Sequence, residues 1–510
     1  MGKTGTSNLI IIVLCVVILG TGYWLLTTFT GFSAARYTTQ VVGLFHSAKF
    51  WGAVGILLLI SLIPVGIRTL SAWSAKKSDR APIVTSDGRA VTERINRGAE
   101  ILEECPYVTM EQTASTLRYM SEKSEPDAID MVDFLLVQAI GQRASDIHWE
   151  PGAEEVIVKF RIDGVMHALT TLPRKVHPRV VSRLRVMSNL AIYKRDVPQD
   201  GRLQTKIRGQ TYELRLSILP TLHAEKCVIR LFNTAELSFR LELLGMPPDT
   251  LEKFREVIAQ PQGTIFLTGP TGSGKTTTIY SALREIQSQR HQSVNIVTIE
   301  DPIEHEIAGF NQTGVNLDRG LTFSVGLRTI LRQDPDVIMV GEIRDIETAQ
   351  IAIRAGLTGH LVFTTLHADS AVGVFNRLIE MGTEPFLLMS SSSAVVAQRL
   401  VRILCSECKK RSIPPLSQLK RAHLAPDENI EFFTATGCSA CSGIGFKGRT
   451  GIYEFLILDD VLREVIIKKV SSREISRIAT ERGMRPLLED GLIKVRQGQT
   501  SLEEVLRVCM

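Results

Sequence analysis

Two long apolar stretches dominate the N-terminal pattern of this 510-residue chain. Residues 9–32 carry no charged side chain and would extend about 36 Å as a helix, and residues 50–67 would extend about 27 Å. Basic residues follow the second stretch, so the positive-inside rule places both the N-terminus and everything after residue 67 in the cytoplasm. The pattern predicts two transmembrane helices. A cleaved signal peptide is the alternative for the first stretch, but the second stretch would still anchor the chain.

The pattern then changes twice along the chain. Residues 74–126 are polar at first and only weakly periodic, which predicts a partly helical linker. Between residues 127 and 235 we expect helices at 128–143 and 176–192 and antiparallel strand pairs, with turns at Asp163-Gly164 and Arg208-Gly209-Gln210. From residue 236 to 510 short apolar strands alternate with helical segments, which predicts a mostly parallel sheet flanked by helices.

A phosphate-binding motif, G-x-x-x-x-G-K-T, directly follows the apolar strand 264–268 and precedes a helical segment. Its glycines let backbone N–H groups approach phosphate oxygens, and the start of the following helix adds its positive end. Lys275 would neutralise the β- and γ-phosphates of ATP, and Thr276 would bind Mg²⁺. The residues of the motif are Gly269, Pro270, Thr271, Gly272, Ser273, Gly274, Lys275 and Thr276.

Three further apolar strands end in polar residues, and the ends of parallel strands meet at one edge of a sheet. Glu342, just beyond the strand 336–340, is the first candidate to position the attacking water, and Glu300 is the second, or an outer contact of Mg²⁺. No aspartate ends the strand 337–340, so the division of roles between the carboxylates stays open. His367, and less strongly His360, are either structural residues or sensors of the γ-phosphate.

Composition adds a second candidate site. The net charge of +5, without basic residues interleaved with aromatic ones, gives no sign of nucleic-acid binding. Four of the eight cysteines form two C-x-x-C pairs, the ligand number and spacing of a closed, structural Zn²⁺ site. We expect Cys405, Cys408, Cys438 and Cys441 to hold Zn²⁺ within an insertion at residues 405–441, where the metal would hold a hairpin together. Thiols that are buried near one another by chance are the alternative.

From about residue 127 to its end the chain resembles the ATPases of type II secretion and type IV pilus assembly. Beyond the phosphate motif and the cysteines, the resemblance rests on ordered signatures: RASDIHWEP at 143–151, FRIDG at 160–164, PQDGR at 198–202, TIEDPIE at 298–304, LRQDPD at 331–336, GEIRD at 341–345, TGH at 358–360, TTLHA at 364–368 and RTGIYE at 449–454.

The resemblance implies an α/β architecture: a RecA-like P-loop ATPase domain at 236–510, preceded by a smaller mixed α/β, PAS-like domain at 127–235 that caps the nucleotide. It implies a homo-hexamer at the bacterial inner membrane whose ATP-driven domain rotation turns a polytopic platform protein, and thereby lifts pilins or pseudopilins out of the bilayer. Arg215 and Arg230 fit the positions where such proteins offer arginines to the nucleotide; exposed structural arginines are the alternative.

The chain departs from this family at its N-terminus, where the predicted anchor of residues 1–73 replaces soluble docking domains. It also has Ala224 where glycine is common. Assembly is favoured over a pilus-retraction ATPase, because retraction motors lack the cysteine insertion and a long N-terminal region. A DNA-transfer or conjugation ATPase of the same superfamily, and a non-hydrolysing membrane scaffold, are the remaining alternatives.

Overall fold

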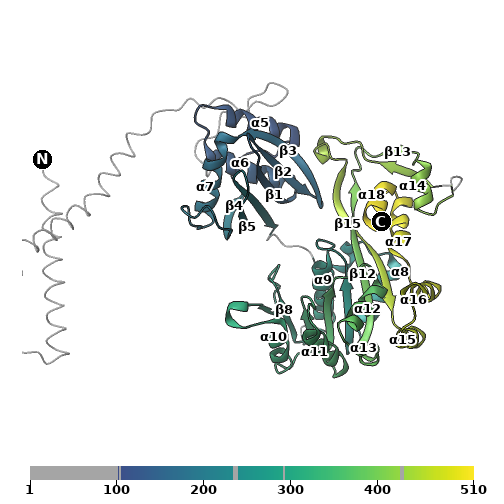
Figure 1. The fold of residues 1–510 in the computed structure, drawn as a ribbon. Helices are drawn as coiled ribbons and strands as arrows, with labels where there is room; N and C mark the ends of the chain where they lie inside the picture. Colours follow the sequence, from purple (N-terminus) through teal and green to yellow (C-terminus); the bar gives the residue numbers. More distant parts are fainter. Residues whose placement is uncertain (1–101, 103–104, 234–238, 291–292, 426–429) are drawn as a thin grey trace, which may run out of the picture. The chain divides into compact units, whose positions relative to one another are not determined.

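The computed structural model describes residue 102 and residues 105–233, 239–290, 293–425 and 430–510 (Figure 1). The two predicted transmembrane helices, and most of the predicted linker, lie outside these residues. Within the described part of the chain, no helix is long and apolar enough to cross a membrane.

The first domain contains a six-stranded sheet with the order β3-β2-β1-β6-β5-β4, in which every neighbouring pair is antiparallel. Along β2, residues 156, 158, 160 and 162 are buried and alternate with more exposed ones, so one face of the sheet packs against helices. The strands are β1 (Ala144–Pro151), β2 (Glu155–Ile162), β3 (Val165–Pro173), β4 (Gln199–Ile207), β5 (Gln210–Pro220) and β6 (Glu225–Asn233), and the helices are α5 (Met110–Glu122), α6 (Ala128–Gly141) and α7 (His177–Met187).

Both predicted hairpin turns are present. Asp163 and Gly164 join β2 to β3, and Arg208 and Gly209 join β4 to β5, each pair with positive φ at both positions. This backbone matches the twist of the strands, as two-residue hairpin loops require. The core of the domain also includes Cys105, Leu117 and Met120, from the segment that the sequence placed in the linker.

Helix α7 is shorter than predicted. The pattern indicated a helix to residue 192, but α7 ends at Met187 and Asn189 adopts a left-handed conformation with φ of 54°. The N–H of Leu190 then donates to the carbonyl of Arg185 at 2.9 Å, which closes the last turn. The segment after Asn189 is therefore a loop, and its residues Arg195 and Asp196 lie at the mouth of a pocket.

The second domain contains a seven-stranded sheet with the order β15-β12-β7-β11-β10-β8-β9. Its neighbouring pairs are parallel except for β15 against β12, which confirms the mostly parallel sheet expected from the alternation of strands and helices. The strands are β7 (Gly263–Thr268), β8 (Ile296–Glu300), β9 (Asn311–Gly314), β10 (Val337–Val340), β11 (Leu361–Leu366), β12 (Ser392–Leu404) and β15 (Phe446–Ile457).

Helices supply the apolar residues that bury this sheet in two large clusters. Strand β7 is buried at every position, as expected for a central parallel strand covered on both faces. The helices are α8 (Pro248–Ile258), α9 (Lys275–Gln289), α10 (Phe323–Ile330), α11 (Ile346–Leu357), α12 (Ala371–Glu380), α13 (Pro385–Ser391), α15 (Asp460–Ile467), α16 (Ser472–Glu481), α17 (Leu487–Arg496) and α18 (Leu502–Cys509). A small insertion between β12 and β15 contains β13 (Lys410–Ser412), α14 (Leu416–Arg421) and β14 (Phe432–Thr434).

Candidate functional site

The phosphate motif forms the connection between β7 and α9, as the sequence predicted. Gly269 and Gly274 have φ of 144° and 87°, a backbone that side chains rarely adopt. Helix α9 starts at Lys275, and no side chain caps its first turn. Its first N–H groups and the positive end of its dipole are therefore available to an anion such as phosphate.

Gln398 of β12 lies directly against this loop. A Cβ atom on Gly269 would lie 2.3 Å from the Gln398 carbonyl oxygen, and one on Gly274 would lie 2.8 Å from its Nε2. The same side chain accepts a 2.8 Å hydrogen bond from Thr278 of α9. Both glycines are thus required by close packing as well as by backbone conformation.

Lys275 and Glu342 are close enough to interact electrostatically. The Lys275 ammonium donates to the carbonyl oxygens of Gly269 and Pro270 at 2.8 and 3.1 Å. Burial lowers the pKa of Lys275, while the negative charge of Glu342 acts in the opposite direction. Glu342 also pairs with Arg344, and its side chain keeps 19% of its exposure. A cation for phosphate and a solvent-accessible carboxylate are therefore close to the loop.

Glu300 occupies a different environment at the end of β8. It is 2% exposed, and its carboxylate accepts hydrogen bonds from the hydroxyls of Tyr280 and Thr298 and from the Gln312 amide, the last at 3.1 Å. Both oxygens are thus occupied by protein donors. Of the carboxylates near this edge, Glu304 and Asp301 lie exposed on the loop that follows β8.

The parallel register brings the carboxyl ends of β7, β8, β10 and β11 to the same edge of the sheet. Thr364 of β11 is paired with Phe266 of β7 and with Val340 of β10, so Glu342 and His367 follow strands that end beside the phosphate loop. His367 is exposed, and the adjacent Ala368 donates its N–H to the Thr268 hydroxyl at 2.8 Å. His360 precedes β11 and therefore lies at the opposite edge, where its Nδ1 contacts the Ala355 carbonyl at 3.1 Å.

Arg215 and Arg230 lie in a row of charged residues across the first domain. The register pairs Arg202 of β4 with Arg215 of β5, and Arg215 with Arg230 of β6. These three residues line a hollow of about 500 Å³. Arg230 also donates to Asp146 at 3.0 Å, and its side chain is 61% exposed. Like charges at paired strand positions repel one another, but Asp146 pairs with Arg230, and Asp200 also lines the hollow. The row therefore places arginine donors beside acidic residues.

Arg202 was not singled out by sequence reasoning. It lies in the PQDGR signature, but its place beside Arg215 depends on the register of β4 and β5. Gln398 was also missed, because its contact with the phosphate loop joins segments more than a hundred residues apart. The available signal for Arg202 was its place next to the buried Leu203, on the alternating pattern of a strand.

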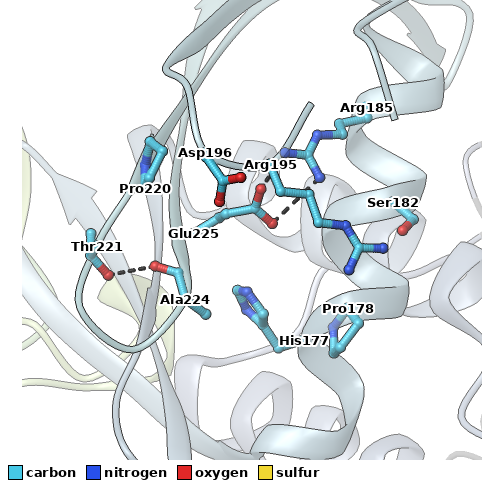
Figure 2. Close-up of a pocket in the computed structure, with 10 residues that line it drawn as sticks. All are labelled: His177, Pro178, Ser182, Arg185, Arg195, Asp196, Pro220, Thr221, Ala224 and Glu225. Carbon is cyan, nitrogen blue, oxygen red and sulfur yellow. Dashed lines mark hydrogen bonds and ion pairs between the residues drawn. The ribbon is translucent and has the colours of Figure 1, made fainter. Parts of the chain in front are cut away.

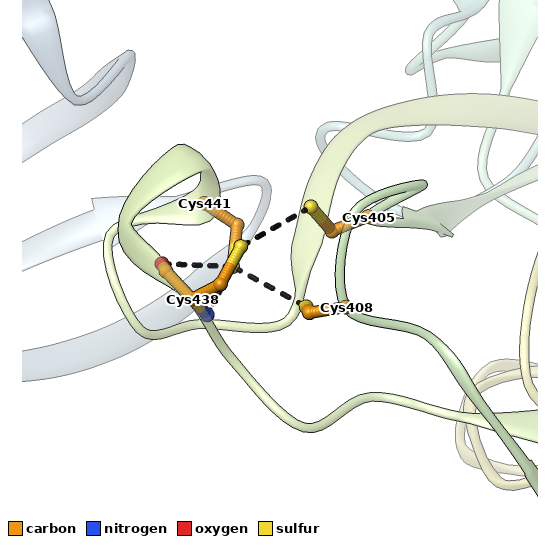
Figure 3. A group of neighbouring side chains, drawn as sticks. All are labelled: Cys405, Cys408, Cys438 and Cys441. Carbon is orange, nitrogen blue, oxygen red and sulfur yellow. Dashed lines mark hydrogen bonds between the residues drawn. The ribbon is translucent and has the colours of Figure 1, made fainter.

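The four cysteines meet in space (Figure 3). Their sulfur atoms lie within 4.8 Å of one another, and three of the separations are 3.7–3.8 Å. Zn–S bonds of about 2.3 Å in a tetrahedron place sulfurs about 3.8 Å apart, so the arrangement fits Zn²⁺. The N–H groups of Cys438 and Gly445 both donate to the Cys441 sulfur at 3.1 Å, which favours a thiolate.

Comparisons with known proteins extend the sequence resemblance. A family model described as type II/IV secretion system protein matches residues 121–507. The type II secretion system ATPase E of Vibrio cholerae serotype O1 is 47% identical over 390 residues, which cover 76% of each chain. The type IV pilus assembly ATPase PilB of Thermus thermophilus is 44% identical over 431 residues, 84% of this chain and 48% of that one.

The fold also resembles a solved structure. The X-ray structure of the Legionella pneumophila ATPase DotB aligns with a TM-score of 0.55 at 21% identity, over 75% of this chain and 96% of that one. At this identity the likeness supports the fold alone. It agrees with the two-sheet α/β architecture described above.

Proposed function

Because this chain belongs to the type II/IV secretion system protein family, we propose that it is an ATP-hydrolysing motor that powers assembly of a type II secretion pseudopilus or a type IV pilus. The observation that carries the reaction is the meeting of the uncapped start of α9, Lys275 and Glu342 at one edge of the sheet. Anion binding and water activation need these groups together.

In this proposal the loop N–H groups and Lys275 bind the phosphates of ATP, and Thr276, half-buried in the first turn of α9, binds Mg²⁺. Glu342 orients the attacking water, since its carboxylate is the more accessible of the two candidates. Glu300 supports this edge from its hydrogen-bonded position, and His367 senses the γ-phosphate. The Mg²⁺ supplies charge neutralisation of the phosphates when it is bound.

The first domain would cap the nucleotide with its arginines. The cross-strand row of Arg202, Arg215 and Arg230 supports this role, because it offers several donors to the phosphates from one face. The cysteine cluster would hold Zn²⁺ as a structural metal, since four thiolates leave no position for a substrate. The first domain would have a PAS-like fold.

The working assembly would be a homo-hexamer at the cytoplasmic side of the bacterial inner membrane. Turnover would drive a polytopic platform protein, and through it pilins or pseudopilins. The apolar residues 9–32 and 50–67 would anchor the motor directly in the membrane. Membrane fractionation of the full chain and of a chain truncated before Ser74 tests this anchoring: a truncated motor that still pellets fully and still functions would exclude it.

Two alternative functions within the same superfamily predict different properties of this chain. A DNA-transfer ATPase should be stimulated by DNA, although the net charge of +5 gives no basic surface excess that would favour it. A retraction ATPase would not need the cysteine insertion, whereas this chain has the complete quartet. Both relatives described above carry names of secretion or pilus assembly.

The experiment that tests the proposal traps the motor in cells with Glu342→Gln and a C-terminal tag. Membranes are solubilised gently, and co-purifying proteins are identified by mass spectrometry, with Lys275→Ala as a matched variant impaired in nucleotide binding. We expect a platform protein and pilin-like subunits, enriched with the trapped variant. Recovery of relaxase or other DNA-processing proteins instead would reassign the motor to DNA transfer.

A further inference from the structure

A pocket of about 270 Å³ lined by both charged and apolar residues lies in the first domain, remote in sequence from the phosphate loop (Figure 2). One wall is a stripe along α7 that starts at His177 and Pro178 and ends at Arg185. The opposite wall is the tip of the β5–β6 hairpin, and the loop after α7 supplies residues at the mouth. The proposed function assigns no role to this pocket.

His177 gives the pocket an unused hydrogen-bond donor. The residue is 4% exposed, and the Trp149 indole N–H donates to its Nδ1 at 3.0 Å. Burial lowers the pKa of His177, so the ring is neutral near pH 7. Because Nδ1 accepts, the single ring proton lies on Nε2. This buried Nε2 has no partner among the described residues, and Figure 2 shows the ring projecting into the pocket.

The four formal charges that line the pocket around His177 sum to zero. At the floor, Arg185 and Glu225 form a buried ion pair, with side chains 2% and 15% exposed. Arg195 and Asp196 lie exposed at the mouth, and for Arg195 no ion pair is found within the described part of the chain. The first turn of α7 has neither an acidic residue nor a side-chain cap. The lining therefore carries no net charge, while the unpartnered imidazole N–H is still available to an anion.

Part of the remaining lining of the pocket is apolar and suits the carbon atoms of a ligand. Pro178, Pro220 and Ala224 present apolar surface between the polar groups. The volume is slightly below the range of about 300–1,000 Å³ common for drug-sized ligands. Asp196 and Glu225 also line the pocket, so they would repel a dianion such as phosphate more strongly than a monoanion.

We propose that this pocket binds a carboxylate, either of a small monocarboxylic acid or of the C-terminal end of a polypeptide. The carboxylate oxygens accept from the His177 Nε2–H and from the Arg195 guanidinium, and the first few carbon atoms pack against the prolines of the two walls. One donor on a neutral imidazole and one on a charged guanidinium suit a monoanion of this size.

Binding is tested by calorimetry on the purified full chain. The probes are sodium butyrate, with sodium chloride as the salt control, and a tetrapeptide with a free or an amidated C-terminus. A second readout is the emission of Trp149 in the full chain with Trp24, Trp51 and Trp73 replaced by Phe, because Trp149 is bonded directly to His177. We expect saturable binding of a free carboxylate and a change in Trp149 emission.

Two variants locate the binding. His177→Asn keeps a side-chain acceptor for Trp149 but removes the Nε2–H, and Arg195→Ala removes the guanidinium; each should weaken binding by about tenfold. Arg473→Ala, at an exposed arginine of α16 outside the pocket lining, should bind as the wild type does. Unchanged thermal unfolding of His177→Asn would show that its effect is not a folding defect, and if that variant unfolds early, Arg195→Ala alone decides.

The probes also identify the source. Binding of butyrate indicates a free small acid, whereas binding of only the peptide with the free C-terminus indicates a polypeptide end. Absence of binding by every probe, or equal binding by the wild type and both pocket variants, would overturn the proposal. Because ATP is not involved, a failed motor function would leave these measurements unaffected.

Discussion

The Thr278 hydroxyl on α9 donates a 2.8 Å hydrogen bond to Oε1 of Gln398 on β12, with both side chains buried. This bond joins the first turn of the helix after the phosphate loop to a strand beneath it. Since Gln398 also lies against Gly269 and Gly274, it fixes the loop from below. Gln398 therefore acts as a positioning residue for nucleotide binding.

Replacing Gln398 with Leu should raise the KM for ATP more than it lowers kcat. The change leaves the buried Thr278 hydroxyl without its acceptor, at a cost of about 1–3 kcal/mol, and loosens the loop. Steady-state ATPase kinetics measure the effect. The double variant Thr278→Ala/Gln398→Leu should recover part of the loss, and simple additivity of the two single variants would show that the bond does not hold the loop.

Glu342→Gln should retain ATP binding but lose at least about a hundredfold in kcat, because an amide cannot orient or deprotonate the attacking water. Binding of a fluorescent ATP analogue and phosphate release measure the two properties separately. The neighbouring Arg344→Ala, which removes the partner of Glu342, is the matched control and should lose less activity. Undiminished turnover by Glu342→Gln would move the catalytic carboxylate elsewhere.

Glu300→Ala should act mainly on stability. Its carboxylate accepts from three buried or half-buried donors, and removing it leaves Tyr280, Thr298 and Gln312 without that acceptor. We expect the free energy of unfolding to fall by about 2–4 kcal/mol, against less than about 1 kcal/mol for Glu342→Ala. Denaturant unfolding followed by circular dichroism compares the two variants; equal stability would mean that the network is not structural.

Purified protein should contain about one Zn²⁺ per chain, held by the cysteine quartet. Cys408→Ser should lower the metal content and the temperature of unfolding, because the thiolates tie the ends of the insertion together. Atomic absorption and thermal unfolding with and without a strong chelator check this expectation. Cys509→Ser, which removes a cysteine outside the quartet, is the control; equal metal loss from both variants would contradict the assignment.

Asp133 should make stability depend on pH. Burial raises its pKa to about 6, against the attraction of Arg183, whereas the unfolded carboxyl titrates near 3.8. Between about pH 4 and 6 the folded chain therefore holds a proton that the unfolded chain releases, so this group's contribution to stability decreases as pH rises. Above pH 6 the loss reaches at most about 3 kcal/mol.

Asp133→Asn imitates the protonated carboxyl and isolates this contribution. The variant should match the wild type near pH 4 and become progressively more stable than it between pH 4 and 6. Denaturant unfolding at several pH values gives the difference, in which other titrating groups cancel. A difference that does not change with pH would show that Asp133 is ionised in the folded protein throughout this range.

Local patterns made the second domain largely predictable. The phosphate loop is a contiguous motif after an apolar strand, so its place between β7 and α9 followed from the residues themselves. Parallel strands necessarily end at a common edge, which placed Glu342 and His367 beside the loop. His360 precedes its strand rather than following it, so it lies at the opposite edge, in agreement with its structural alternative.

What the sequence could not reveal depends on contacts between distant segments. Glu300 was the second candidate after Glu342, and no pattern in the sequence indicated that Tyr280 from α9 and Gln312 from β9 occupy its oxygens. The end of α7 depended on Asn189 adopting a left-handed conformation, where the apolar pattern continued to residue 192. The neighbours of Arg215 likewise depended on strand register, which periodicity alone does not fix.

Strand β12 contacts the phosphate loop through Gln398 and leads directly to Cys405, seven residues further along. At about 3.3 Å per residue, roughly 23 Å separate these points, and β15 is hydrogen-bonded along this length. The β12–β15 strand pair thus runs from the phosphate loop to the cysteine quartet. If nucleotide binding alters the affinity of the quartet for Zn²⁺, then Zn²⁺ must alter the affinity for nucleotide by the same factor.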